Sequence, residues 1–463
     1  MANQSIYYFS SASCGSGKTE WAIRQMVQNR GRYVYVVDRT DEFEGRRERI
    51  SGVSAEVGNW PAVRALSSKA GDVVTRDFPH TIDQLSLSPH AILIITHEAM
   101  KLVDHTVVAG HEWQIIIDED PKIWSHAAFD LPASQAFWAN TYNLETFMDG
   151  YSTIRPKADA PTWREMMADD FARPFAPLHA RLDRGQTVVN IENWADLPKR
   201  KRLSFFSVWN VEELLVYDRV TFLANSFESL VTYRLITALF ESIKLVGIPL
   251  IRAVSWKPRR VSINYVASNH RAGTNFFVNS PQGQKAVEAW AAWVNGRAEA
   301  VHHYWATNRS RAITLPGQRV SPKIAGSNAY RHLTQCSVLY TAKASSTESR
   351  IFAALTDGLI TAEEVMRDRE YEDLIQIVFR SSLRMPDDDR PVTLNVYDRE
   401  QAEFLEGYFR DSCFPFEVVL DHHDIGIDFE ERPVGRPTVT GKAKSNAERQ
   451  RAWRERQALK RAA

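Results

Sequence analysis

The chain of 463 residues contains only three cysteines, Cys14, Cys336 and Cys413. They lie far apart, and no C-x-x-C pair or histidine at zinc spacing accompanies them, so the sequence indicates neither a disulfide framework nor a zinc site. It also lacks an apolar run of about 18 residues, the length that crosses a membrane. The opening MANQSIYYF has no basic segment before an apolar stretch and does not resemble a secretory signal. We therefore expect a cytoplasmic protein without a membrane partner.

A surplus of either charge is also absent, because the formal net charge is zero, yet the charges are unevenly distributed. The segment from Arg432 to Ala463 contains ten Lys or Arg residues and two Glu residues, so its net charge is +8. The preceding 431 residues therefore have a net charge of −8. This end predicts a flexible basic arm with a terminal helix. A solubilising tail, or one that folds back on the acidic body, is the alternative interpretation. The sequence GRP at 435–437 also resembles the centre of an AT-hook that binds the minor groove.

A glycine-rich stretch, SSASCGSGKT, lies between the strand-like SIYYF and the helix-like EWAIRQMVQ. Such a turn directs backbone N–H groups and the positive end of the helix at a phosphate. Lys18 is placed to reach the β- and γ-phosphates, and the hydroxyl of Thr19 can ligate Mg²⁺. The usual P-loop begins with Gly where this chain has Ala12. The pattern predicts a nucleoside-triphosphate site made of Ala12, Ser13, Cys14, Gly15, Ser16, Gly17, Lys18 and Thr19.

Three further β-branched runs follow within the first 120 residues: RYVYVVDRT, AILIITHEAM and QIIIDED. Each ends in polar residues, which is typical of a buried parallel sheet whose carboxyl edge carries the chemistry. In the last run, Asp118 and Glu119 follow three isoleucines, and an acidic pair there is costly unless it meets a cation. We expect Asp118 to hold Mg²⁺ and Glu119 to polarise the attacking water. An ordinary surface turn is the alternative.

The P-loop form A-x-x-G-x-G-K-T, combined with Asp118, Glu119 and Asp120, resembles the core of superfamily 2 (DEAD/DEAH-like) helicases. Weaker stretches follow in the family's order: IITHEAM, VTFLANSF at 220–227, AGSNAYRH at 325–332 and QIVFRSSLR. The resemblance implies ATP and Mg²⁺ as cofactors and two RecA-like lobes that close on ATP. It also implies contacts with the phosphates and sugars of a nucleic acid by Thr96, His97 and Asn328.

The stretch QIVFRSSLR resembles the arginine box of the second motor lobe. Gln376, Arg380 and Arg384 have the spacing i, i+4 and i+8, which predicts one face of a helix aimed at the cleft between the lobes. In the family, such an arginine finger acts on the γ-phosphate and raises the rate by about 10³ to 10⁵. The box departs from the family at Phe379, and either Arg380 or Arg384 fits the finger. A solvated basic helix face is the other interpretation.

The predicted fold class is α/β, with two RecA-like parallel-sheet lobes, an insertion on the first lobe and the basic tail. The expected boundaries are 1–244 for the first lobe, with the insertion at about 123–213, then 245–431 for the second lobe and 432–463 for the tail. Aromatic residues of the insertion are expected to form the core of a small domain: Trp124, Trp138, Tyr142, Trp163 and Trp194.

These features predict an ATP-dependent helicase or translocase that acts on a nucleic acid, and we expect DNA rather than RNA. The degenerate motifs and basic tail also resemble proteins of bacteriophages and mobile elements, which implies the cytosol of a bacterium or an infected host and replication or recombination proteins as partners. Two alternatives stay open. One is an ATP-switched loader that does not unwind. The other is a viral packaging motor with a nuclease domain, for which Asp398 and the DHHD at 421–424 are weak metal-ligand candidates.

Overall fold

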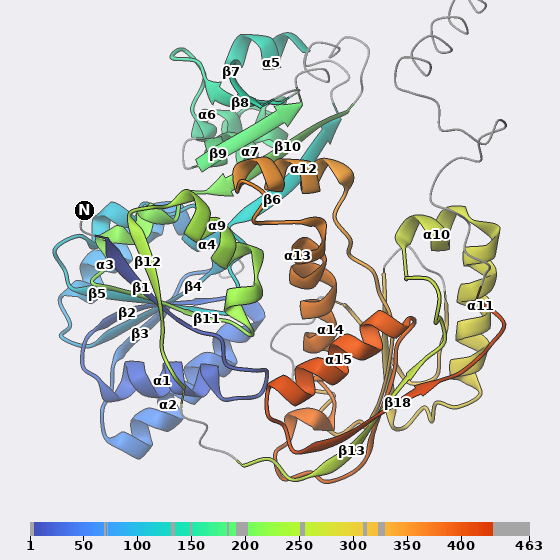
Figure 1. The fold of residues 1–463 in the computed structure, drawn as a ribbon. Helices are drawn as coiled ribbons and strands as arrows, with labels where there is room; N and C mark the ends of the chain where they lie inside the picture. Colours follow the sequence, from blue (N-terminus) through green and yellow to red (C-terminus); the bar gives the residue numbers. More distant parts are fainter. Residues whose placement is uncertain are drawn as a thin grey trace, which may run out of the picture.

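The protein is described here by a computed structural model that covers residues 4–68, 71, 73–130, 135–148, 151–182, 185–190, 202–250, 255–308, 313–322 and 329–428. Its strands form three sheets, two of them parallel and one antiparallel. Figure 1 shows the antiparallel sheet above the first parallel sheet, with the second parallel sheet beside them. The expected α/β class with two RecA-like lobes is confirmed.

The first parallel sheet has seven strands in the order β12-β1-β11-β5-β2-β4-β3. Their bounds are Ser5–Ser10 (β1), Arg32–Val37 (β2), Ala62–Ala65 (β3), Ala91–Thr96 (β4), Trp113–Asp118 (β5), Arg219–Leu223 (β11) and Ile243–Gly247 (β12). The main helices around it are Lys18–Gln28 (α1), Phe43–Val57 (α2), Val74–Ser86 (α3), His97–Met100 (α4) and Val231–Leu239 (α9). The β-branched runs of the sequence become these buried strands, because both faces of the sheet are covered.

The expected boundary at 244/245 is wrong. It cuts β12, which pairs in parallel with β1 from Ile243 to Gly247 and so completes the first sheet. Among the described residues, none of the helices has the length and apolar character needed to span a bilayer.

The antiparallel sheet interrupts the first lobe between β5 and β11, and its strand order is β6-β10-β9-β8-β7. Its strands are Trp124–Asp130 (β6), Tyr142–Met148 (β7), Tyr151–Pro156 (β8), Gly185–Asn190 (β9) and Arg202–Trp209 (β10). Its helices are Gln135–Thr141 (α5), Trp163–Ala168 (α6) and Ala176–Leu182 (α7). Trp138 and Tyr142 lie in its buried core, Trp124 joins the core shared with the first lobe, and Trp163 is half-buried. Trp194 lies outside the described residues.

The second parallel sheet has six strands in the order β15-β14-β16-β17-β13-β18. They are Arg259–Tyr265 (β13), His303–Thr307 (β14), Gln318–Val320 (β15), Gln335–Leu339 (β16), Val392–Asn395 (β17) and Phe416–His422 (β18). Its helices are Thr274–Asn279 (α10), Pro281–Asn295 (α11), Ser346–Leu355 (α12), Ala362–Met366 (α13), Glu372–Val378 (α14) and Arg399–Asp411 (α15). A π-helical segment, Arg367–Tyr371 (η7), connects α13 to α14.

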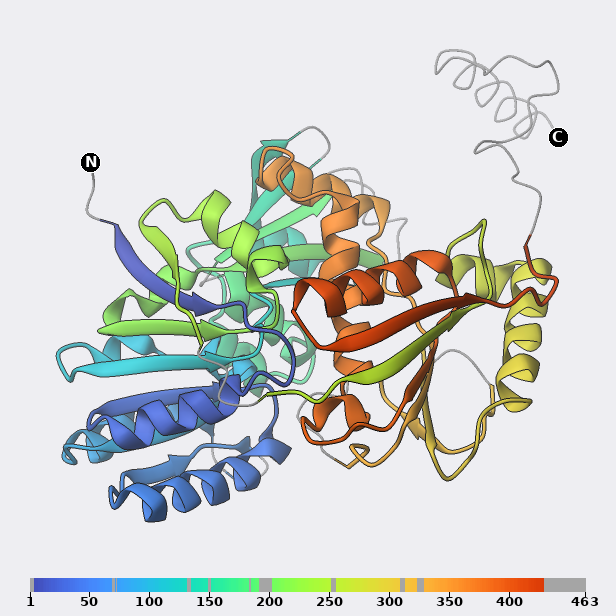
Figure 2. The ribbon, with the colours of Figure 1, turned by 60° about the horizontal axis from the view of Figure 1, so that its bottom comes forward.

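Helices α13 and α14 lie between the two parallel sheets, and α12 lies next to the antiparallel sheet, as Figures 1 and 2 show. Phe352 of α12 and Val365 of α13 belong to the core cluster of the first lobe, whereas Leu374 and Ile375 of α14 belong to that of the second lobe. One run of helices therefore ties the two lobes together and brings α14 to the carboxyl edge of the first sheet.

Candidate functional site

The P-loop connects β1 to α1 at the carboxyl edge of the first sheet. Gly15 and Gly17 have φ values of 73° and 87°, which let the loop curl back on itself. The ammonium group of Lys18 donates to the carbonyls of Ala12 at 2.6 Å and Ser13 at 3.1 Å. The buried hydroxyl of Ser16 has no hydrogen-bond partner among the described residues. This unsatisfied hydroxyl and the lysine fit the cradle of a phosphate group.

Thr19 and Asp118 form the oxygen-rich part of the site. The hydroxyl of Thr19, at the start of α1, donates to Oδ2 of Asp118 at the end of β5 over 2.8 Å. Asp118 is only 2% exposed. A hydroxyl and a carboxylate at this separation fit Mg²⁺, which prefers oxygen ligands and retains several waters.

Glu119 follows Asp118 in a backbone conformation that is rare for residues other than glycine, with φ of 70°. Its N–H donates to the carbonyl of Leu223 over 2.8 Å, which holds it at the end of β11. Burial, together with the charge of Asp118, raises the pKa of Glu119. A strained, half-buried carboxyl beside a second, buried one is typical of a functional site.

Asp120 is the third acidic residue of the DED sequence and follows Glu119 directly. Its Oδ1 accepts from the backbone N–H of Lys122 over 3.1 Å, and burial raises its pKa to about 6. Glu119 and Asp120 both line a cavity that they share with the P-loop, so this end of the DED sequence is not a solvated surface turn.

The arginine box does not form a single helix face, so that prediction is wrong. Helix α14 ends at Val378, and Arg384 lies in a separate 3₁₀ helix, Ser382–Arg384 (η8). The hydroxyl of Ser381 caps η8 by accepting from the N–H of Leu383, and this local bond competes with continuation of the helix.

Arg380 and Arg384 nevertheless differ clearly in their surroundings. Arg380 is 1% exposed and donates to Oε1 of Gln376 over 3.2 Å. Arg384 lines the central cavity, and burial lowers its pKa. Arg384 therefore lines the cavity beside the P-loop, whereas Arg380 is buried against Gln376, where its charge opposes the rise in the pKa of Glu119.

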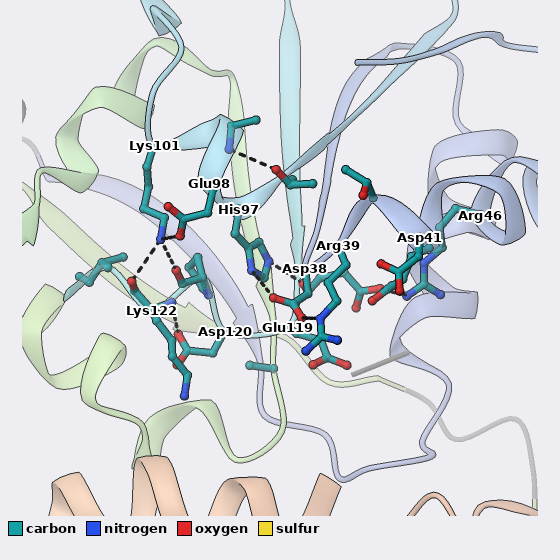
Figure 3. A pocket seen from close by; sticks show the side chains of 18 of the residues that line it. Asp38, Arg39, Asp41, Arg46, His97, Glu98, Lys101, Glu119, Asp120 and Lys122 are labelled. Atoms are coloured by element: carbon teal, nitrogen blue, oxygen red, sulfur yellow. Dashed lines mark hydrogen bonds and ion pairs between the residues drawn. The ribbon is translucent and has the colours of Figure 1, made fainter. Parts of the chain in front are cut away.

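A central cavity of about 1670 Å³ connects these groups. It is lined by Lys18, Thr19, Asp118 and Glu119 from the first lobe and by Glu372, Gln376 and Arg384 from the second. Figure 3 shows Asp41 and Arg46 on one side of this cavity, Asp38, His97 and Glu119 in its middle, and Lys101 and Lys122 on the other side. The P-loop and the acidic pair Asp118 and Glu119, which are far apart in the sequence, thus share one cavity with the arginine box.

The three residues expected to contact nucleic acid differ from one another in their surroundings. Thr96 caps α4 by accepting from the N–H of Ala99 over 3.2 Å and lines the cavity. His97 is 4% exposed, and its Nε2 donates to the carbonyl of Asp118 over 2.9 Å. This burial argues against a direct contact of His97 with a nucleic acid. The hydrogen bond instead indicates that His97 helps to position Asp118. Asn328 lies outside the described residues.

Two residues of the site, Tyr35 and Arg46, carry no motif signal in the sequence. Tyr35 donates to Oδ2 of Asp118 over 2.7 Å, and Arg46 of α2 lies 3.4 Å from the same oxygen. Asn225, within the stretch VTFLANSF at 220–227, contacts Tyr408 and Glu372 of the second lobe. Within the described residues no group of three or more His, Cys, Asp or Glu side chains is arranged to hold a metal, the DHHD stretch included.

No protein-family model matches the chain, and the comparison with curated proteins finds no match. Solved structures do match. One is XPD in an apo form, at 11% identity and a TM-score of 0.53, over 89% of this chain and 97% of that chain. Another, an XPD helicase, has 11% identity and a TM-score of 0.50 over 90% of this chain and 96% of that chain. At this identity the likeness concerns the fold alone: the chain shares the overall fold of these two structures.

Proposed function

We propose that this protein is an ATP-dependent nucleic-acid helicase or translocase. One observation carries the proposal: the P-loop and acidic pair of the first lobe share a cavity with Arg384 of the second lobe. Only an arrangement of this kind makes hydrolysis depend on how the two lobes meet, and such dependence is what a motor needs to couple ATP to movement.

Each residue of the site has a role that follows from its position. Lys18 and the amides of the P-loop would bind the phosphates, and Thr19 with Asp118 would hold Mg²⁺, which neutralises phosphate charge when it is bound. Glu119, with its raised pKa and half-buried position, would accept a proton from the attacking water. Arg384 would stabilise charge on the phosphoryl group. Gln376 and Arg380 would hold the second-lobe residues that line the cavity in position.

The polymer would cross both lobes, with Thr96 on one and Asn328 on the other, and DNA is the expected partner. Replication or recombination proteins of a bacteriophage or mobile element would be its context. An ATP-switched loader uses the same cavity and differs in its response to a polymer.

The test is an ATPase assay with no polymer, single-stranded DNA, duplex DNA and RNA. We expect stimulation by single-stranded DNA above the others. Lys18→Ala should abolish tight nucleotide binding, whereas Glu119→Gln should retain binding and lose turnover, because only the second group acts on the water. Retention of normal turnover by either variant would contradict the motor, and turnover that no polymer stimulates would favour the loader.

A further inference from the structure

Tyr408 of α15 reaches across the interface to the backbone of the P-loop. Its hydroxyl accepts from the N–H of Cys14 over 2.8 Å and donates to Oδ1 of Asn225 over 2.7 Å. All three groups are buried, so water cannot replace either partner without opening the interface. One hydroxyl of the second lobe thus joins two loops at the carboxyl edge of the first sheet.

The same chain of hydrogen bonds continues to the arginine box. Nδ2 of Asn225 donates to Oε2 of Glu372 over 2.6 Å, and Nε2 of Gln376 donates to Oε1 of that carboxylate over 3.0 Å. Oε1 of Gln376 then accepts from Arg380 over 3.2 Å. Every donor in the chain has a matching acceptor, so it forms a continuous connection from the P-loop to the box.

Apolar packing holds this connection in place. The side chain of Cys14, 6% exposed, belongs to the core cluster of the second lobe together with Trp256, Phe379 and Phe414. A Cβ on Gly15 would lie 2.9 Å from the ring of Trp256, so the second lobe also restricts the next residue of the loop. Movement of the P-loop is therefore transmitted to the second lobe through contacts that have little room to yield.

We infer that Tyr408 is a positioning residue that couples the conformation of the P-loop to the placement of the arginine box. The inference rests on the proposed ATPase and adds a regulatory connection to the same site. When a phosphate enters the loop, the Cys14 amide and its partner hydroxyl shift together, and Asn225, Glu372 and Gln376 carry the shift to Arg380. Loss of the hydroxyl breaks the connection at its first step.

The test compares the full-length protein with Tyr408→Phe, which removes only the hydroxyl. Hydrogen exchange at the Cys14 amide should become at least about tenfold faster, because the amide loses its acceptor. The kcat for ATP should fall about tenfold while the Kd for nucleotide changes less than about threefold, since the phosphate contacts stay intact. Tyr217→Phe is the matched control, because Tyr217 is also buried and hydrogen-bonded, to His105, but lies away from the P-loop.

A double variant separates coupling from general destabilisation. If Tyr408 acts through the box, Tyr408→Phe added to Arg380→Ala should lower kcat by less than about twofold further, because the connection is already broken. Multiplication of the two losses, or unchanged exchange at Cys14, would overturn the inference while leaving the ATPase intact. Absence of turnover in the wild-type protein with every polymer would instead overturn the proposed function, and the coupling with it.

Discussion

At the scale of single residues, one carboxylate oxygen of Asp118 interacts with three different side chains. Its Oδ2 accepts from Thr19 and Tyr35, and the guanidinium of Arg46 lies 3.4 Å away. Arg46 also pairs with Glu42 over 2.6 Å. A positive charge therefore stands where the carboxylate would meet Mg²⁺, and the two cations repel each other.

Removal of this charge should strengthen the binding of Mg²⁺. We expect Arg46→Met to lower the Mg²⁺ concentration for half-saturation about three- to tenfold at low salt, because Asp118 then attracts the metal without a competing cation. A fluorescent nucleotide titrated with Mg²⁺ gives the value. Arg49→Met is the matched control, because Arg49 lies on the same helix and pairs with Glu20 and Glu56. Weaker Mg²⁺ binding in Arg46→Met would mean that Arg46 supports the metal.

Glu372 should make stability depend on pH. Burial raises its pKa to about 7 from an ordinary 4.5, against the opposing hydrogen bonds from Gln376 and Asn225. The native state thus keeps the proton between about pH 4.5 and 7, where the unfolded chain loses it. This stability is fully present below pH 4.5 and is lost as pH rises through 7. Relative to Glu372→Gln, the wild-type protein should lose up to about 3 kcal/mol of unfolding free energy between pH 5 and 8.

Urea unfolding of both proteins at the two pH values measures that difference directly, because groups that titrate in both proteins cancel. A wild-type protein that instead gained stability relative to the variant at pH 8 would show that its amide partners keep Glu372 ionised.

At the scale of elements, the sequence predicts what depends on local pattern. The three isoleucines before Asp118 are buried, and β5 ends at Asp118. The repeat of Gln376, Arg380 and Arg384 suggested one helix, yet the cap made by Ser381 starts a new turn. Residues far apart in sequence were beyond reach: Tyr408 meets Cys14 across 394 positions, and no periodicity reports such a contact.

Helix α12 follows β16 of the second sheet but packs on the antiparallel sheet. The ring of Phe352 lies edge-on to Trp124 and Phe206, with centroids 4.9 and 4.8 Å away. Glu348 of the same helix lies 3.4 Å from Nδ1 of His126 and pairs with Arg369 over 2.6 Å. The insertion therefore supports this arrangement of the two lobes through helix α12.

Phe352→Ala should loosen that arrangement and cost about 3 to 5 kcal/mol of unfolding free energy. Cys14 reports on the loosening, since it is buried against the second lobe and its pKa is raised by burial to about 12. In a Cys413→Ser background, a thiol reagent should label Cys14 faster, because a thiol reacts once it is exposed and ionised. Phe277→Ala, in a cluster within the second lobe, should leave that rate unchanged. Equal rates in both variants would contradict the role of α12.

At the scale of the whole molecule, charge divides the chain into an acidic body and a basic end. The ten Lys or Arg residues from Arg432 to Ala463 follow the last strand, and this segment lies outside the described residues. A segment of this composition cannot bury an apolar core, but it can bind a polyanion. The central cavity is lined by residues that precede this segment, so ATP turnover and polyanion binding should be separable.

Deletion of residues 432–463 should weaken DNA binding and leave ATP turnover near normal at saturating DNA. Each Lys or Arg that neutralises a phosphate releases a counterion, so the slope of log K against log salt should flatten by about 0.7 to 0.9 for each lost contact, and by several units in all. Fluorescence anisotropy across a salt series measures the slope. Substitution of the tail's Lys and Arg residues by Gln, at constant length, controls for the loss of chain. An unchanged affinity and slope in the deletion variant would mean that the tail does not bind DNA. Its alternative partner would then be the acidic part of the same chain.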